Sequence, residues 1–247
     1  MRIASIFVVA FLAALLSSMS GAGAGIILFP SLLWMGFPYP LVAAISSVNS
    51  ACWVLPASRN YLKGRQVNWM LVIGYSALGL IGCYLGVLLV VHVNQRKLEL
   101  CVGALIMFLV VYAYIRKGFG EKRREPASVM GRTVGYLASL PLGFYETVFG
   151  SGNGILFSTL TVHAEGFEFR EALGHYYLVS FSWGFYAAIL LAEKGYYDIP
   201  VMATAAAGSV LGGYLGSLYA RGKGNRFLKL LALIIGGFLG IKMVMGW

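Results

Sequence analysis

Charged side chains are scarce in this sequence of 247 residues, where Asp, Glu, Lys and Arg together make up 11%. Soluble domains carry about 25% charged residues. Hydrophobic residues make up 59% of the chain and the mean hydropathy is +0.79, so a water-soluble fold of this length could not bury its apolar side chains. The composition therefore excludes a soluble enzyme. Recurring apolar stretches of about 20 residues instead indicate a polytopic α-helical membrane protein.

The residues required for several catalytic mechanisms are also missing. The chain has one aspartate, Asp198, whereas an intramembrane aspartyl protease needs two aspartates that share a proton. It has no HExxH, GxSxG or GxxxxGK[ST] motif, so metalloprotease, hydrolase and P-loop sites lack their residues. The three cysteines do not have metal-ligand spacing and imply no disulfide framework. We therefore expect no enzyme activity, no metal and no cofactor.

Ten apolar segments follow one another along the chain, and two of them are too short to cross a membrane. As helices, residues 25–36 and 154–164 would span only about 17 Å, against a hydrocarbon core of about 30 Å. Each of the two follows a glycine-rich break, at 21–25 and at 150–154. The ten segments lie near residues 3–20, 25–36, 40–60, 68–92, 97–116, 130–149, 154–164, 171–192, 199–220 and 226–246.

A shift of 129 or 130 residues brings the two halves of the chain into register. The glycine-rich breaks coincide, and so do several residues that follow them. We therefore predict a first repeat at 1–117, a basic linker at 118–129 and a second repeat at 130–247. Residues 1–22 also resemble a secretory signal peptide, but 130–149 occupy the equivalent place and cannot be one. The matched pairs include Ser50 with Ser180, Trp53 with Trp183, Gly82 with Gly212, and Gly86 with Gly216.

The basic residues distinguish two ways of threading these segments through a membrane. If each glycine-broken pair of segments is a re-entrant hairpin, 14 basic residues lie on one side and 5 on the other; if each pair crosses once, the split is 12 against 7. The positive-inside rule favours the first arrangement. Each half then has three crossings, which inverts the second repeat relative to the first, as in many secondary transporters.

We therefore predict an all-α polytopic membrane protein with two inverted repeats, each a glycine-broken re-entrant hairpin plus three transmembrane helices. The expected location is the bacterial cytoplasmic (inner) membrane, with the linker at 118–129 in the cytoplasm. The net charge of +10 is spread over short loops, which indicates membrane topology rather than nucleic-acid binding.

The glycine-rich breaks are the first candidate binding site. A break that opens a helix presents free N–H groups and the positive end of the helix dipole to one point. Two such breaks related by inversion would converge on a small anion. The alternative is that these glycines only allow close helix packing. The candidate residues at the breaks are Gly23, Gly25, Ser151, Asn153 and Gly154.

Polar stripes on the helices that follow the breaks are the second candidate. Spacings of i, i+4 and i+7 place the members of each stripe on one helix face, where hydroxyl, amide and indole N–H donors would suit an oxyanion. The alternative is hydrogen bonding between helices, worth roughly 0.6 kcal/mol per contact. The candidates are Ser46, Ser47, Asn49, Ser50 and Trp53 in the first half, and His175, Tyr176, Ser180 and Trp183 in the second.

Glu146 lies in an otherwise apolar segment, four residues before Gly150. Ionisable groups inside a membrane are costly and usually face a cavity. We expect Glu146, together with His175, to exchange protons and to couple anion movement to the proton gradient. The alternative is a neutral carboxylic acid that holds the hairpin together.

Four motifs are distinctive, namely Gly21–Gly25 with Pro30 and Gly36-Phe37-Pro38, the stretch from Tyr61 to Trp69, Gly143-Phe144-Tyr145-Glu146 before Gly150, and Ala172-Leu173-Gly174-His175. Together they resemble the sulfite exporter TauE/SafE family of membrane permeases. The resemblance covers nearly the whole chain, although Ala22, Ala24, Ser151 and Asn153 dilute the glycine runs that are usual in the family. It implies export of sulfite, organosulfonates or related sulfur-containing anions without a nucleotide-hydrolysing subunit.

Composition and spacing alone predict a secondary carrier of a small anion that works by alternating access. The resemblance narrows the expected substrate to a sulfur-containing or organic anion. An anion channel on the same repeat, and a membrane sensor or scaffold that does not transport, are the alternatives. The expected partners are a small anionic substrate and the lipid bilayer, with no nucleic acid; the sequence leaves open whether the protein forms a homo-oligomer.

Overall fold

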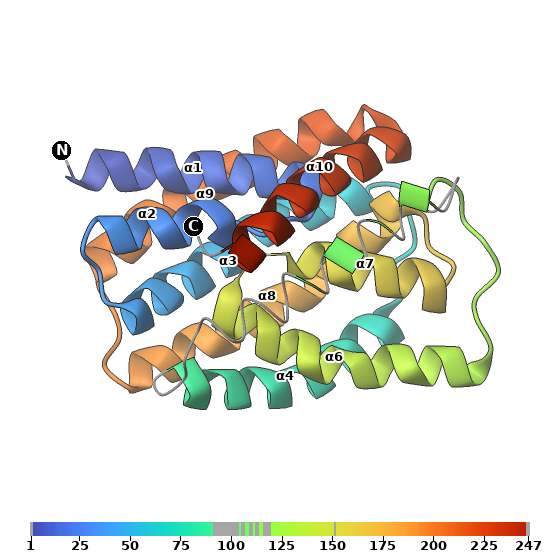
Figure 1. The fold of residues 1–247 in the computed structure, drawn as a ribbon, viewed down its shortest axis with the longest axis horizontal. Coiled ribbons are helices and arrows are strands. Elements are labelled where there is room, and N and C mark those ends of the chain that lie inside the picture. The colour runs from blue at the N-terminus through green and yellow to red at the C-terminus, as the bar shows by residue number, and fades with distance from the viewer. Residues whose placement is uncertain are drawn as a thin grey trace.

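The computed structural model describes residues 2–90, 120–150 and 152–245, with isolated positions between 104 and 115. Within these residues the regular structure is helical (Figure 1). The helices match the predicted apolar segments to within a few residues, except for 97–116, which falls largely outside the described residues. They are α1 (Arg2–Ser20), α2 (Gly25–Trp34), α3 (Tyr39–Leu62), α4 (Trp69–Val90), α6 (Val129–Phe149), α7 (Asn153–Ala164), α8 (Phe169–Glu193), α9 (Ile199–Arg221) and α10 (Gly224–Met245).

The outer faces of the molecule are apolar. Four of the described helices are long and apolar enough to cross a membrane, namely residues 3–20 of α1 together with α3, α4 and α9. Large apolar side chains on the outside, such as Val8 of α1, Ile81 of α4 and Leu211 of α9, are about half exposed. Exposed apolar surface of this extent is typical of a protein that contacts lipid. The chain is thus a multi-pass membrane protein.

The helices α3 and α8 form the centre of the molecule. They pack against each other, and each also contacts one helix of the opposite half, α3 contacting α9 and α8 contacting α4. Around them, α1 packs along α9 and α6 packs along α4. The indole rings of Trp53 in α3 and Trp183 in α8 are fully buried. The candidate polar stripes therefore lie in the protein interior rather than on its lipid-facing surface.

Equivalent glycines in the two halves make equivalent contacts. A Cβ on Gly82 of α4 would lie 1.9 Å from the carbonyl oxygen of Leu140 in α6, and a Cβ on Gly212 of α9 would lie 2.2 Å from that of Phe11 in α1. Phe11 and Leu140 are themselves related by the shift of 129 residues. Such matching contacts are expected of a duplicated unit. The repeat boundaries stay a prediction, and the boundary at 117/118 lies outside the described residues.

Both glycine-rich breaks interrupt a helix and reverse the chain. After α1 the chain turns back into the short helix α2, and after α6 it turns back into α7 (Figure 1). The turns require left-handed backbone conformations, with φ of 74° at Gly21, 78° at Gly23, 58° at Gly150 and 79° at Gly152. Glycine adopts such angles without the steric cost that a Cβ brings. The helices α2 and α7 have 10 and 12 residues, so neither is long enough to span a membrane.

The two breaks pack directly against each other. The Gly25 N–H donates to the carbonyl oxygen of Gly150 over 3.0 Å, and the Gly152 N–H donates to that of Ala22 over 2.5 Å. A Cβ on Gly154 would lie 2.3 Å from the carbonyl oxygen of Gly21. Glycine is therefore needed here for close backbone approach as well as for the turns.

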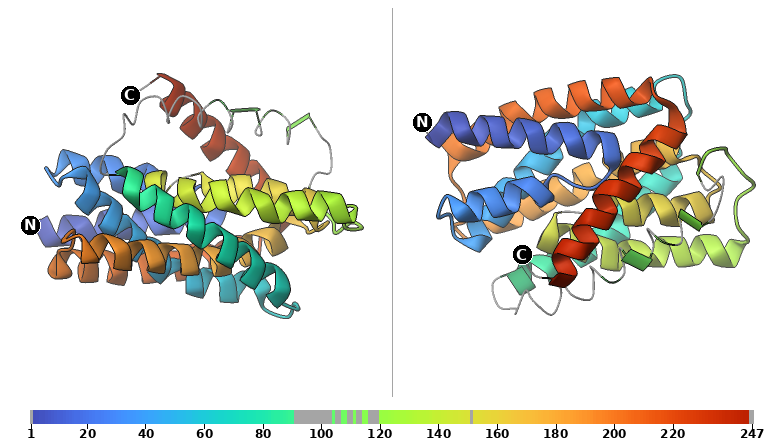
Figure 2. Two further views of the ribbon diagram at one scale, coloured as in Figure 1. Left: turned by 90° about the horizontal axis from the view of Figure 1, so that it is seen from below. Right: turned by 45° about the horizontal axis from the view of Figure 1, so that its top comes forward.

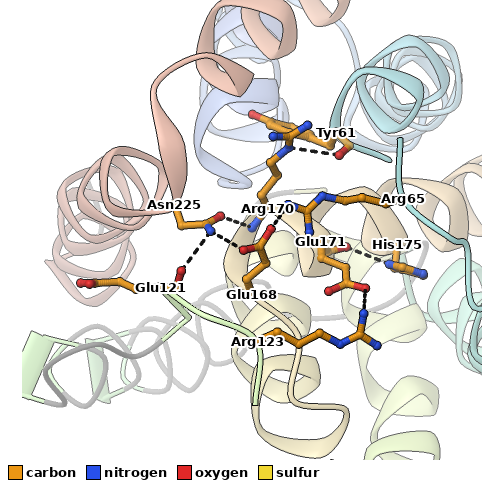
Figure 3. A network of polar contacts seen from close by, with 9 residues as sticks. All are labelled: Tyr61, Arg65, Glu121, Arg123, Glu168, Arg170, Glu171, His175 and Asn225. Atoms are coloured by element: carbon orange, nitrogen blue, oxygen red, sulfur yellow. Dashed lines mark hydrogen bonds and ion pairs between the residues drawn. The ribbon is translucent and has the colours of Figure 1, made fainter. Parts of the chain in front are cut away.

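Four connecting segments meet at one end of the helices. The basic linker runs beside the α7–α8 turn, where the Arg124 N–H donates to the Gly166 carbonyl over 2.7 Å and the Phe169 N–H donates to the Gly120 carbonyl over 2.7 Å. The α9–α10 turn joins them, since the Asn225 amide donates to the Glu121 carbonyl over 3.1 Å. The α3–α4 turn (residues 63–68) reaches the same end, through the polar contacts in Figure 3.

Candidate functional site

Glu146 is the centre of a buried polar cluster near the end of α6. One carboxyl oxygen, Oε2, accepts hydrogen bonds from Asn153 Nδ2 over 2.6 Å and from the Tyr176 hydroxyl over 2.9 Å. The other, Oε1, accepts from Ser180 Oγ over 2.9 Å. The three donors are uncharged and come from α7 and α8. The structure thus brings together four predicted site residues from three helices, and all four belong to the second half of the chain.

A small cavity lies beside this cluster, where α2, α3, α6 and α8 meet. Its volume is about 10 Å³, which is close to the minimum for one water molecule. Of the predicted residues, it brings together Glu146 with three serines and a tryptophan. The lining residues are Phe29, Ala43, Ser46, Ser47, Ser50, Glu146, Thr147, Gly150, Trp183, Gly184 and Ala187.

The α3 side of this site contains buried donors that no described residue satisfies. Ser46 Oγ at the cavity, both amide atoms of Asn49 and Trp53 Nε1 have no hydrogen-bond partner in the described part of the chain. In contrast, Ser47 Oγ donates to the Ala43 carbonyl over 2.8 Å. Buried polar groups are normally paired. The unpaired Ser46 hydroxyl therefore marks a place in the cavity where a hydrogen-bond acceptor would be favourable.

Asn49 and Trp53 lie apart from the cavity, at the contact between α3 and α9. The Asn49 carbonyl accepts from Ser209 Oγ over 3.4 Å, and Gly213 of α9 packs against the Trp53 backbone and Cβ. Its counterpart Trp183 does line the cavity and is held there, because its Nε1 donates to the Ser76 carbonyl over 3.2 Å. The two predicted stripes thus contribute unequally to the site.

His175 is not beside Glu146. Its Nε2 accepts from the Asn68 N–H over 3.0 Å, its Nδ1 donates to the Glu171 carbonyl over 2.8 Å, and its ring stacks on Phe167 at 4.7 Å. These partners place it near the start of α8, where the connecting segments meet (Figure 3). The structure therefore separates His175 from the cavity. Of the two predicted proton-coupling residues, Glu146 lines the cavity and His175 does not.

The glycine-rich breaks contribute less directly to the cavity than the sequence predicted. The N–H of Gly25 is already bound to the Gly150 carbonyl, and Gly154 packs against Gly21. Gly23 lines a separate, apolar cavity of about 330 Å³ beneath α10, the helix that crosses the face of the molecule in Figure 2. Ser151 lies outside the described residues. The residues around this second cavity are Leu16, Ser17, Ser20, Ala22, Gly23, Ile27, Ile234, Ile235 and Phe238.

The sequence analysis missed a network of charged residues at the end where the connecting segments meet (Figure 3). Arg65 of the α3–α4 turn forms an ion pair with Glu168, whose Oε2 also accepts from Asn225 Nδ2 over 2.7 Å. Arg123 of the linker pairs with Glu171 over 3.1 Å. The signal available in the sequence is the spacing of Glu165, Glu168 and Glu171, which places three of the nine acidic residues within seven positions.

Nearly the whole chain is similar to proteins that are named as probable membrane transporters. Residues 6–243 match the family described as "Sulfite exporter TauE/SafE". A "Probable membrane transporter protein" of Haemophilus influenzae is 28% identical over 99% of this chain and 96% of its own length. "Probable membrane transporter protein ORF9" of a Sinorhizobium species is 26% identical, over 98% of this chain and 92% of its own. "Probable membrane transporter protein YfcA" of Escherichia coli K12 is 22% identical, over 97% and 88%.

No solved structure matches the chain. The family match covers almost every described helix, including both breaks and the Glu146 cluster. Taken with the apolar helices, these findings show that the chain belongs to the TauE/SafE sulfite exporter family and is a membrane transporter.

Proposed function

We propose that the protein is a secondary transporter that moves a small sulfur-containing or organic anion, such as sulfite or an organosulfonate, out of the cell by alternating access. The observation that carries this proposal is the cavity where α2, α3, α6 and α8 meet, which is lined by Glu146 and by the unpaired Ser46 hydroxyl. The described lining contains no basic residue, so the anion would be bound by neutral donors.

The anion would bind on the α3 side of the cavity. Ser46 and Ser50 offer hydroxyl donors there, whereas the amide of Gly25 is occupied by the opposite break. A hydrogen bond from a neutral donor to a charged acceptor contributes about 1.5–3 kcal/mol. A few such donors, in a site shielded from water, would hold a small oxyanion and release it again.

Glu146 would couple the anion to a proton. Two negative charges side by side in a site of low dielectric constant repel strongly, so the anion binds when Glu146 is protonated. The hydroxyls of Ser180 and Tyr176 can rotate to accept that proton's hydrogen bond. Anion and proton then move together, and the sum of their gradients sets the direction. Export follows when the anion accumulates in the cytoplasm.

The cavity volume of about 10 Å³ is too small for sulfite, which has four heavy atoms, because it barely accommodates one water molecule. The site must therefore widen during transport, which we assign to a movement of one repeat against the other. Two features support inverted repeats. The helices α1 and α6 run in opposite directions in Figure 1, and their contacts with α9 and α4 are equivalent.

The meeting of the connecting segments supports the re-entrant arrangement. In that arrangement the α3–α4 turn, the linker, the α7–α8 turn and the α9–α10 turn share one side of the membrane; if each broken pair crossed once, the α7–α8 turn would lie opposite the α3–α4 turn. The contact between Arg65 and Glu168 joins these two turns. Because the segments are basic, we place this side in the cytoplasm of a bacterial inner membrane.

Counterflow in proteoliposomes tests the proposed function. Vesicles loaded with unlabelled sulfite should transiently accumulate labelled sulfite, and the rate should saturate with concentration, since a carrier binds one substrate per cycle. Linear, unsaturated flux without counterflow would indicate an anion channel instead. A protein that neither transports nor binds any sulfur-containing or organic anion would be a sensor or scaffold of another kind.

Anion binding should also stabilise the purified protein. A ligand at 100 times its Kd stabilises a folded protein by about 2.7 kcal/mol, so sulfite should raise the unfolding temperature. Ser46→Ala removes one donor and should weaken binding roughly tenfold or more, which would be measured as a shifted concentration dependence. Ser58→Ala is the matched control on the same helix, because its hydroxyl donates to the Gly174 carbonyl away from the cavity. Equal effects of the two substitutions would contradict the assignment of Ser46.

A further inference from the structure

The charged network in Figure 3 connects the two halves of the chain. Arg65 belongs to the first half and pairs with Glu168 of the second. Two further contacts cross between the halves nearby, from the Asn68 N–H to His175 Nε2 and from Arg170 Nε to the Tyr61 carbonyl over 3.1 Å. If the halves move against each other, these contacts must break.

An aromatic layer lies between the cavity and this network. The Tyr177 ring packs against Trp53 at 5.0 Å, Tyr61 at 5.8 Å and Tyr176 at 5.4 Å. These four side chains are fully buried. The hydroxyls of Tyr61 and Tyr177 both donate to the Ser18 carbonyl, over 2.7 Å and 3.1 Å, which joins the layer to the end of α1. Among the described residues, these packed rings therefore occupy the interior between Glu146, which binds Tyr176, and Arg170, which binds the Tyr61 carbonyl.

A second aromatic contact lies near the start of α3. There Phe29, which lines the cavity, packs against Tyr39 at 5.5 Å. The Tyr39 hydroxyl donates to the Val148 carbonyl over 2.5 Å, next to Thr147 of the cavity wall. This aromatic pair thus packs beside the cavity, on the side of α2 and the start of α3.

We propose that the network is a latch, formed by Arg65, Arg123, Glu168, Glu171 and Asn225, that holds the mouth of the transporter closed at this end. This inference rests on the proposed alternating access, because a latch has a role only if the mouth also opens. The Arg65 side chain is 31% exposed and that of Glu168 is 14% exposed. Water can therefore reach both charges when the pair separates, which lowers the desolvation cost of breaking and re-forming it in each cycle.

His175 supports the same closure from the protein interior. Its ring accepts a hydrogen bond at one nitrogen and donates at the other, so the contact to the α3–α4 turn requires the neutral ring. Arg123 lies over Phe167 at 5.7 Å, and Phe167 stacks on His175. The latch therefore joins the α3–α4 turn, the linker and the start of α8 through both charged and aromatic contacts.

Thiol labelling tests the latch. In a background in which Cys52, Cys83 and Cys101 are replaced by serine, Ala187→Cys places a reporter in the cavity wall. A membrane-impermeant thiol reagent is added to right-side-out or to inside-out vesicles, and the labelling rate is measured from each side. With the latch intact, labelling from the latch side should be the slower of the two. Arg65→Gln should raise the labelling rate from the latch side at least several-fold. The labelling rate from the other side should stay the same or fall.

Lys63→Gln is the matched control, because it removes the same charge from the same turn without removing the ion pair to Glu168. Equal labelling rates for Arg65→Gln and Lys63→Gln from the latch side would overturn the proposal, and so would rapid latch-side labelling of the parent.

A second pair of variants tests the latch if Arg65→Gln folds poorly. Arg65→Cys with Glu168→Cys, joined by a bifunctional thiol reagent, should stop latch-side labelling and counterflow, and a reducible cross-linker should allow both to recover. Continued counterflow in the cross-linked protein would also overturn the latch. Labelling requires no transport, so a failure of the proposed carrier function would be recognised separately by the absence of counterflow in the parent.

Discussion

A Glu146→Gln variant is expected to lose the response of anion transport to an imposed proton gradient. Glutamine resembles the protonated carboxyl group in shape and charge but cannot release a proton. If the anion binds when Glu146 is protonated, the variant should still carry out anion counterflow. Gradient-driven sulfite movement in proteoliposomes should fall to the background level, and comparison of the two assays would separate coupling from binding.

Glu193→Gln is the control, because Glu193 is an exposed acidic residue at the end of α8. An unchanged gradient response in Glu146→Gln would remove Glu146 from the coupling mechanism and leave it as a buried structural acid. The folding of the variant needs to be measured as well. The amide oxygen cannot replace both carboxyl oxygens toward three donors, and one unsatisfied buried donor costs about 1–3 kcal/mol.

Gly82→Ala and Gly212→Ala are expected to destabilise the protein strongly and to similar extents. In each case the added Cβ would lie 1.9 or 2.2 Å from a backbone carbonyl oxygen of the facing helix, so the two helices would have to separate. Overpacking of this kind typically costs 1–3 kcal/mol and occasionally more. The measurement is the thermal unfolding of the purified variants and the fraction of monodisperse protein in detergent.

The control for this prediction is Gly222→Ala. Gly222 has φ of −73°, and the Tyr219 carbonyl oxygen would be 3.6 Å from the new Cβ, which is an ordinary contact. The unfolding temperature of the Gly222→Ala variant should stay close to that of the parent protein. If Gly82→Ala and Gly212→Ala were as stable as Gly222→Ala, the close packing of α4 on α6 and of α9 on α1 would be wrong, and with it the matched contacts that support the duplication.

The sequence predicted the helical architecture well because its signals are local. Apolar residues in runs of about 20 form helices in a membrane irrespective of what surrounds them, since each helix satisfies its own backbone hydrogen bonds. The breaks were equally visible, because only glycine readily adopts the positive φ angles found at Gly21 and Gly150. Glu146 could be identified because an acidic residue in an apolar segment is rare.

The placement of the site residues depended on contacts between distant parts of the chain. The N–H of Gly25 is occupied because Gly150, 125 residues later, accepts its hydrogen bond. Equally, His175 turns toward Asn68 and away from Glu146, although its neighbour Tyr176 binds that carboxyl group. Adjacent residues on a helix point in directions about 100° apart, so which of them reaches the cavity is decided by the packing of α8.

By itself, then, the sequence determined that the chain is an all-helical membrane protein with two interrupted segments and a buried acid, because hydropathy and glycine conformation act over a few residues. Only the tertiary structure decided that the breaks bind each other, that the Ser46 hydroxyl remains unpaired in the cavity that Glu146 also lines, and that the charged turns meet at one end. Those outcomes depend on which helices become neighbours, and the pairing energies involved are set by distances through space rather than along the chain.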